Sequence, residues 1–388
     1  MTVSKSLEPY LKLMAEKQAS DLFFTTGAPP SIKINGVLKP VSKSRLEAGM
    51  VRKLAQGLLN DHQFEDFKQG LEYNLALSVS ELGRFRVNLY HQRGEVSMVV
   101  RHIKSDIPTV DALNLPPVLN DIVMQKTGLI LMVGATGSGK STSLAAMIDY
   151  RNQKHAGHIL TIEDPIEYVY QHKKSIVGQR EIGIDTHSYQ NALREAMREA
   201  PDVILIGEIR DQETMEAAIT YADTGHLCLS TLHAVNANQA LDRIINLFPP
   251  EQKNQILMDL SLNLKAIVSQ RLLPDKEGKR IPAVEVLINT PYISELIRKG
   301  EMGEIKEVME KGAQTGMQTF DQSLYALYTS GLVDMKQALN YADSKTNLEW
   351  KINFGGDAMA NSLDSQKNAQ TDDTLNFDAD DVDVALRD

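Results

Sequence analysis

The sequence contains a single cysteine, a single tryptophan and no long apolar run. The lone cysteine, Cys228, excludes internal disulfides and any zinc site that needs four cysteines. Apolar runs such as residues 129–133 and 203–206 are far shorter than the roughly 20 residues that a transmembrane helix requires. Residues 1–21 mix charges and lack the continuous apolar stretch of a signal peptide. We therefore expect a cytoplasmic chain that reaches a membrane only through partners.

Positive charge is also scarce, because 41 lysines and arginines face 51 aspartates and glutamates, for a net charge of −10. Residues 355–388 hold nine aspartates against Lys367 and Arg387, so this tail carries −7 and the rest of the chain −3. Nonspecific DNA binding usually needs a basic face, so we expect no direct nucleic-acid partner, although a ring pore can be locally basic. Residues 351–388 are predicted to form an acidic, disordered tail, which either keeps the protein soluble or docks on a basic partner.

Residues 1–105 have the pattern of a small mixed domain of helices and strands. Residues 7–17 show helical spacing of apolar side chains, and residues 51–67 are predicted to form a second helix. Alternating apolar residues around Asn35 and Gly36 predict a β-hairpin. Three further strands are predicted at residues 73–79, 84–90 and 95–103, and the middle one would place Phe85, Val87 and Leu89 on one face and Arg84, Arg86 and Asn88 on the other.

A proline-containing linker at residues 106–117 leads into a second domain, predicted at residues 118–350. There, short apolar runs alternate with helical stretches, which is typical of an α/β domain with a largely parallel sheet. The predicted strands are residues 129–133, 159–162, 203–206 and 227–229, and the predicted helices are residues 141–150, 189–199 and 213–221. From residue 252 to about 341 we expect a helical region.

A glycine-rich segment between the first strand and the first helix of this domain fits the phosphate-binding loop pattern in full. Its glycines let successive backbone N–H groups point at phosphate oxygens, and the following helix adds a partial positive charge. We expect Lys140 to contact the β- and γ-phosphates of ATP and the Ser141 hydroxyl to bind Mg²⁺. The residues predicted to bind nucleotide are Gly134, Ala135, Thr136, Gly137, Ser138, Gly139, Lys140, Ser141 and Thr142.

Acidic residues follow two of the predicted strands, at the sheet edge where an open α/β fold binds its ligands. Glu163 follows the strand at residues 159–162, and Glu208 follows the strand at residues 203–206. Gly207 stands where a Walker B strand usually has its aspartate, so we expect Glu208 to reach Mg²⁺ through water and Glu163 to polarise the attacking water. Either acid could instead cap a helix or pair with an arginine.

Two histidines, His226 and His233, flank the strand predicted at residues 227–229. His233 comes at the carboxyl end, where it could sense the γ-phosphate by hydrogen bonding. No further histidine, cysteine or acid stands at the spacing of a zinc site. A lone histidine is more often structural, so that role stays open for both.

These motifs together resemble the four signature boxes of the type II/IV secretion ATPases. The boxes are the phosphate-binding loop, an acidic box at residues 163–167, a Walker B box at residues 207–211 and a histidine box at residues 225–233. The pilus retraction branch is the most similar, because residues 21–22, 83–88, 270–272 and 316–321 also match it. The resemblance covers about residues 1–350. It implies an N-terminal PAS-like α+β domain, a RecA-like ATPase domain with C-terminal helices, and a ring of six copies that retracts type IV pili with ATP and Mg²⁺.

In such a ring, arginines of one N-terminal domain would reach the phosphates bound by the neighbouring subunit. By motif position these would be Arg86 and Arg101, with Arg84 and Arg210 as alternatives. A guanidinium presents a fork of donors to phosphate oxygens, although each arginine could equally lie in solvent or in a surface ion pair. The resemblance also implies a paralogous retraction ATPase and an inner-membrane platform protein of the pilus machine as partners.

Departures from the family pattern indicate which branch of the family the sequence resembles most. A single cysteine cannot form the four-cysteine zinc segment that extension and secretion ATPases commonly carry. Residues 292–301 and the acidic tail differ from the main retraction ATPase and resemble an accessory retraction ATPase, which is thought to work alongside its paralogue. Two alternatives stay open: a nucleotide-regulated scaffold that supports the paralogue's ring without its own hydrolysis, and a DNA-translocating or secretion ATPase of the same superfamily.

Overall fold

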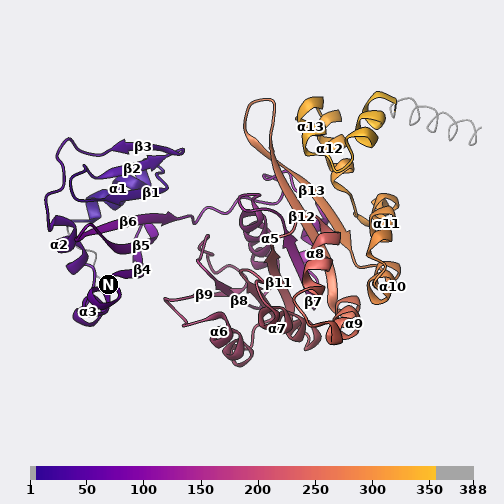
Figure 1. Ribbon diagram of the computed structural model, residues 1–388, viewed down its shortest axis with the longest axis horizontal. Helices are drawn as coiled ribbons and strands as arrows, with labels where there is room; N and C mark the ends of the chain where they lie inside the picture. Colours follow the sequence, from indigo (N-terminus) through magenta and orange to yellow (C-terminus); the bar gives the residue numbers. More distant parts are fainter. Residues whose placement is uncertain (1–5, 355–388) are drawn as a thin grey trace, which may run out of the picture. The chain divides into compact units, whose positions relative to one another are not determined.

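The computed structural model describes residues 6–354 (Figure 1). Contacts divide the chain into two units: one runs to Leu272 and resumes over Arg280–Thr319, and the other holds Leu273–Lys279 and the chain from Phe320 onward. The larger unit contains two separate β-sheets with helices, so the predicted α/β class is confirmed. The domain boundaries at residues 105, 117 and 350 stay predictions. The predicted disorder of residues 351–388 is wrong for residues 351–354, which are helical, and the rest of that predicted tail lies outside the described residues.

The first sheet is antiparallel, with the strand order β3-β2-β1-β6-β5-β4. Its strands are β1 (Asp21–Phe24), β2 (Ser31–Ile34), β3 (Val37–Pro40), β4 (Glu72–Val79), β5 (Gly83–Gln92) and β6 (Glu95–Ile103). The predicted hairpin is confirmed, because Asn35 and Gly36 join β2 to β3 with φ values of 49° and 81°, as a type I′ turn requires. The strands predicted from residue 73 to residue 103 are also confirmed.

Three helices share a core with this sheet: α1 (Glu8–Glu16), α2 (Met50–Gln56) and α3 (Asp61–Gly70). The single helix predicted at residues 51–67 is wrong, because Gly57 ends α2 and Asn60 starts α3. The Asn60 side chain accepts a hydrogen bond from the Gln63 N–H, and the Gln63 side chain accepts one from the Asn60 N–H. This reciprocal capping box satisfies donors at the new helix start and so favours two short helices over one long one.

The second sheet has the strand order β13-β12-β7-β11-β10-β8-β9. Its strands are β7 (Gly128–Val133), β8 (His158–Glu163), β9 (Ile176–Glu181), β10 (Val203–Ile206), β11 (Leu227–Leu232), β12 (Leu264–Pro274) and β13 (Arg280–Ile288). Every neighbouring pair from β12 to β9 is parallel, which confirms the predicted largely parallel sheet. The carboxyl ends of β7, β8, β10 and β11 therefore lie at one edge.

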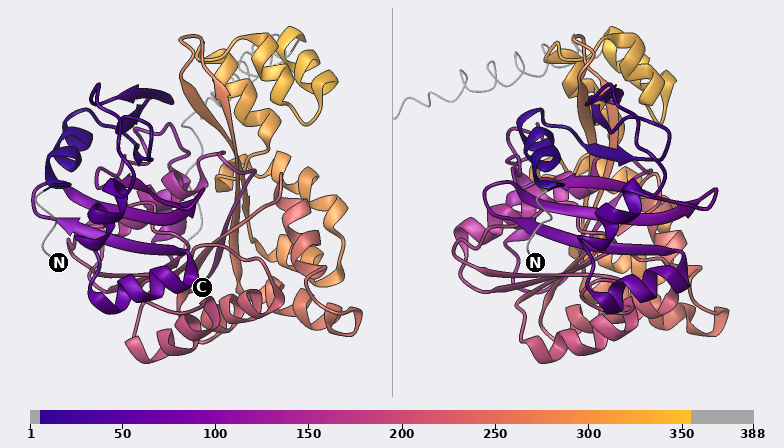
Figure 2. Two further views of the ribbon diagram at one scale, coloured as in Figure 1. Left: turned by 60° about the vertical axis from the view of Figure 1, so that its left-hand side comes forward. Right: turned by 90° about the vertical axis from the view of Figure 1, so that its left-hand side faces the viewer.

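Helices cover both faces of this sheet (Figures 1 and 2). One face carries α4 (Val118–Val123) and α5 (Lys140–Lys154). The other carries α6 (Tyr189–Ala196), α7 (Gln212–Asp223), α8 (Ala237–Ile245), α9 (Lys253–Asn263), α10 (Pro291–Lys299) and α11 (Ile305–Lys311), with short 3₁₀ turns at Met197–Glu199, Pro250–Gln252, Met302–Glu304 and Ala313–Thr315. Along β7, Leu129, Leu131 and Val133 belong to one core, and Ile130 and Met132 belong to the other. A strand buried on both faces reads as a continuous apolar run, which explains why sequence inspection finds β7 readily.

The helical region expected from residue 252 to 341 is wrong over β12 and β13. Lysine, alanine, leucine and glutamine in β12 favour helix intrinsically, but the strand is buried beside β7 and tertiary packing overrides that preference. The sequence does contain residues typical of the turn between β12 and β13, namely Asp275 and Gly278. Asp275 accepts hydrogen bonds from the N–H groups of Glu277 and Lys279, and Gly278 has φ of 79°.

The smaller unit combines Leu273–Lys279 with α12 (Phe320–Thr329), α13 (Met335–Tyr341) and helical residues 345–354. Its buried side chains include Phe320, Leu324, Val333, Ala338 and Leu348. No helix within residues 6–354 is both long and apolar enough to span a bilayer.

Candidate functional site

The phosphate-binding loop joins the end of β7 to the start of α5. Gly139 has φ of 89°, and a Cβ at this position would lie 2.7 Å from Gln270 Nε2 on β12. Both the backbone conformation and the lack of space therefore require glycine here. Since α5 begins at Lys140, its first N–H groups and its positive end lie at the loop, which favours an anionic phosphate.

Lys140 is buried and bends its ammonium back over the loop. Lys140 Nζ donates hydrogen bonds to the carbonyl oxygens of Gly134 at 2.7 Å and Ala135 at 3.0 Å. Burial lowers the pKa of Lys140, and the nearby Glu208 carboxylate opposes this. A buried cation whose hydrogen bonds go to neutral carbonyls is a natural partner for phosphate oxygens, which would compensate its charge.

Two serines of the loop region offer unused oxygen atoms. Ser138 Oγ is buried and has no hydrogen-bond partner within residues 6–354. Ser141 is exposed at the second position of α5, whereas Thr142 Oγ1 already lies 2.9 Å from the Tyr168 hydroxyl. The described residues contain no group of three or more His, Cys, Asp or Glu side chains that could hold a metal by themselves. Oxygen donors of this kind fit Mg²⁺ only together with the phosphates of a nucleotide.

Gln270 on β12 braces the loop, a structural role that was not predicted from the sequence. Ser143 Oγ on α5 donates to Gln270 Oε1 at 2.7 Å, and Gln270 Nε2 donates to the Ser138 carbonyl oxygen at 2.8 Å. All three residues are buried. The side chain therefore ties the loop and the first turn of α5 to β12, which sequence reasoning placed in a helix.

Gln270→Ala should lower the free energy of unfolding by about 2 kcal/mol and weaken ADP binding by about tenfold, because two buried polar groups lose their partners and the loop loosens. Thermal unfolding and titration with a fluorescent ADP analogue would measure the two effects. Gln318→Ala is the matched control, since Gln318 Nε2 donates to the Val284 carbonyl at 2.7 Å away from the loop. Equal losses of ADP affinity in both variants would contradict the bracing role.

Glu163 ends β8 with a buried carboxyl group. Thr161 Oγ1 donates to Glu163 Oε1 at 2.7 Å, and Gln179 Nε2 lies 3.3 Å from the same oxygen. Burial is the main reason that the pKa of Glu163 rises to about 7, and the two hydrogen bonds oppose it. A carboxyl group with this pKa can exchange a proton near neutral pH, as a general base must.

The raised pKa of Glu163 also predicts how stability depends on pH. The protonated acid folds at no charge cost, so its favourable contribution is present below about pH 4.5 and is lost as the pH rises through about 7. Glu163→Gln removes this dependence. Relative to wild type, the variant should gain about 2 to 3 kcal/mol of unfolding free energy between pH 5 and pH 8. Urea unfolding at both pH values would measure this gain, with the exposed Glu216→Gln as control. If the difference in unfolding free energy between Glu163→Gln and wild type is the same at pH 5 and pH 8, Glu163 does not ionise with a raised pKa in the folded protein.

Glu208 lies between the side chains of Arg210 and His233. Glu208 Oε1 is 3.0 Å from His233 Nε2, and Glu208 Oε2 accepts from Arg210 Nε at 2.8 Å. Arg210 is also 3.8 Å from Asp164, and its pKa is raised mainly by the hydrogen bond to Glu208. This clamp links the acidic, Walker B and histidine boxes, so each box contributes to one charged cluster.

The other predicted site residues lie elsewhere or carry other contacts. His226 precedes β11, at the opposite end of that strand from His233, where its Nδ1 lies 3.2 Å from the Tyr221 carbonyl oxygen. Arg86 and Arg101 are paired across β5 and β6 of the first sheet. Arg101 Nε donates to the buried Asp21 at 2.8 Å, so this arginine has an intrachain partner.

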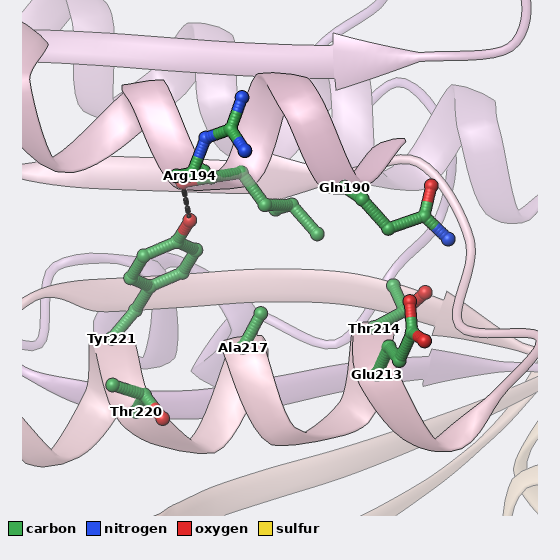
Figure 3. Close-up of a pocket in the computed structure, with 8 residues that line it drawn as sticks. Gln190, Arg194, Glu213, Thr214, Ala217, Thr220 and Tyr221 are labelled. Atoms are coloured by element: carbon green, nitrogen blue, oxygen red, sulfur yellow. Dashed lines mark hydrogen bonds between the residues drawn. The ribbon is translucent and has the colours of Figure 1, made fainter. Parts of the chain in front are cut away.

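A separate pocket of about 290 Å³ lies between α6 and α7 (Figure 3). Figure 3 shows Gln190 on one helix and Thr214, Ala217 and Tyr221 on the other, whereas the Arg194 guanidinium points away from the second helix. The Tyr221 hydroxyl donates to the Leu193 carbonyl oxygen. None of the predicted nucleotide-binding residues lines this pocket.

The parallel sheet and the loop between β7 and α5 define a P-loop nucleotide-binding fold. Residues 1–339 match the family described as type II/IV secretion system protein. The chain belongs to this family, and the predicted membership among type II/IV secretion ATPases is confirmed.

Two relatives come from Pseudomonas aeruginosa. The type IV pilus ATPase PilU is 52% identical over 359 residues, which cover 92% of this chain and 94% of PilU. The type IV pilus retraction ATPase PilT is 40% identical over 337 residues, which cover 87% of this chain and 98% of PilT. A crystal structure of the pilus retraction motor PilT with bound ADP matches with a TM-score of 0.81 at 42% identity, covering 88% of this chain and 98% of that one. The predicted similarity to pilus retraction ATPases is confirmed.

Proposed function

We propose that this chain is a subunit of a hexameric ATP-driven motor for type IV pilus retraction, and that it is the accessory, PilU-type subunit. The observation that carries the proposal is the placement of Lys140, Glu163, Glu208 and His233 around the carboxyl edge of one parallel sheet. The 52% identity to PilU, against 40% to PilT, supports the accessory type.

The proposed mechanism assigns one task to each group. The loop N–H groups and Lys140 bind the phosphates, and Glu163 takes a proton from the attacking water. Ser141 and Glu208 would hold Mg²⁺, the latter partly through water, and the ion would neutralise charge on the phosphates. His233 bridges Glu208 to the γ-phosphate position.

The wider assembly follows from the family resemblance. The first sheet with α1–α3 would be a PAS-like domain, and the parallel sheet would be a RecA-like ATPase domain. Six copies would form a ring in which Arg86 or Arg101 of one subunit reaches nucleotide on its neighbour, and Arg101 would then have to share or leave Asp21. Cytoplasmic rings would act at the inner membrane through a platform protein and alongside a PilT-type paralogue.

Steady-state ATPase measurements on the purified chain, alone and mixed with the PilT-type paralogue, test this proposal. Turnover alone would establish an autonomous motor subunit, and turnover only in the mixture would establish dependence on the paralogue. Because retraction requires hydrolysis by this chain, a Glu163→Gln copy should fail to restore twitching in a strain that lacks the gene and carries a weakened paralogue. Full restoration would favour the scaffold, and stimulation by DNA would favour a DNA-translocating ATPase.

A further inference from the structure

Gly207 follows β10 at the position where a Walker B aspartate would stand. Its φ does not lie in the left-handed region, so its backbone conformation does not demand glycine. A Cβ at this position would lie 2.9 Å from Tyr189 Oη and 3.2 Å from the Cα of Glu163. The Tyr189 hydroxyl therefore occupies the space that a side chain at position 207 would need.

The backbone on both sides of this contact is well anchored. Tyr189 is the first residue of α6, which Ser188 caps by accepting the Asn191 N–H at 3.2 Å. The Gly207 N–H donates to the Ile162 carbonyl oxygen at 2.8 Å, and Thr231 Oγ1 donates to the Gly207 carbonyl oxygen at 2.8 Å. These bonds hold the Tyr189 hydroxyl over the junction between the ends of β8 and β10.

Burial and the charges of four ionisable residues act on the Tyr189 phenol. Burial raises the pKa of Tyr189, Asp164, Glu163 and Glu208 raise it further, and Arg210 opposes them. The hydroxyl therefore stays protonated and remains a donor. Within the described part of the chain this hydroxyl makes no hydrogen bond and is not among the fully buried unpartnered polar atoms, so the donor is open to water near the backbone of Glu163.

We propose that Tyr189 is a further residue of the hydrolytic site: its hydroxyl donates a hydrogen bond to the water that Glu163 polarises and so fixes the position of that water. The inference deepens the proposed hydrolysis and rests on the role of Glu163. It also explains the departure at Gly207, since the phenol takes the room of the missing aspartate side chain.

Tyr189→Phe tests the proposal, because it removes only the hydroxyl group. The expected result is a fall in kcat of about tenfold, with KM and the affinity for a fluorescent ADP analogue within about twofold of wild type. Tyr221→Phe is the matched control, since that hydroxyl donates to the buried Leu193 carbonyl and should affect the thermal midpoint but not kcat. Wild-type turnover in Tyr189→Phe would overturn the proposal. If Glu163→Gln also keeps full turnover, the proposed role of Glu163 as the base fails, and the Tyr189 proposal fails with it.

A double-mutant cycle with Gly207→Ala tests the contact without using activity. The added methyl group meets Tyr189 Oη in the wild-type background, but it does not meet a hydroxyl in the Tyr189→Phe background. Gly207→Ala should therefore lower the thermal midpoint more in wild type than in Tyr189→Phe. Equal shifts in both backgrounds would show that the hydroxyl does not occupy this space.

Discussion

Replacement of Glu163 by glutamine is expected to lower kcat for ATP hydrolysis by about a thousandfold and to leave ADP affinity within about twofold. Glu163 is buried at the end of β8, and burial raises its pKa to about 7. Glutamine keeps the shape of the side chain and an oxygen that accepts the Thr161 hydroxyl, but it cannot take a proton. The loss should therefore fall on the chemical step. Phosphate release and titration with a fluorescent ADP analogue would measure the two quantities.

The pH dependence of kcat separates a base from a residue that only shapes the site. Wild-type kcat should rise about tenfold per pH unit below about pH 7, where Glu163 is protonated, and level off above it. The residual rate of Glu163→Gln should lack this rise. Glu216→Gln, which changes an exposed glutamate on α7, should match wild type throughout. A variant rate above about a tenth of wild type would exclude Glu163 as the base.

Motifs whose residues are adjacent in the sequence could be predicted, because their chemistry depends on the conformation of a short stretch of backbone. The phosphate-binding loop needs only a strand, closely spaced glycines and a helix start, and all three lie within residues 128–154. The acidic residues Glu163 and Glu208 were placed correctly at strand ends, because buried parallel strands form uninterrupted apolar runs. The roles of these residues stay predictions.

Contacts between distant segments could not be read in this way. Gln270 reaches the loop across more than a hundred residues, and only the parallel pairing of β12 with β7 brings it there. Tyr189 looked like an ordinary helix residue, and its position over Gly207 depends on the packing of α6 against the strand ends. The clamp of Arg210 and His233 on Glu208 likewise requires β10 and β11 to be neighbours.

Lys140→Ala should reduce kcat/KM for ATP by at least about a thousandfold, and ADP affinity should fall with it. Lys140 Nζ is the cation that closes over the Gly134 and Ala135 carbonyls, so its loss leaves the phosphate charge to backbone N–H groups alone. In contrast to Glu163→Gln, both binding and turnover should suffer. Lys154→Ala is the matched control, because it removes the same charge from the other end of α5, about 20 Å away.

Lys140→Ala can be interpreted because the lysine is not expected to stabilise the fold. Burial lowers its pKa, which shows that the charged form is held at a cost, so alanine should leave the thermal midpoint near that of wild type. Normal ADP binding by a folded Lys140→Ala protein would mean that the loop N–H groups hold the phosphates without the lysine. Lost ADP binding by a folded variant would show that Lys140 supplies the positive charge that the phosphates require. The variant would then serve as a nucleotide-free subunit, with which one can ask whether a mixed ring with the PilT-type paralogue still hydrolyses ATP.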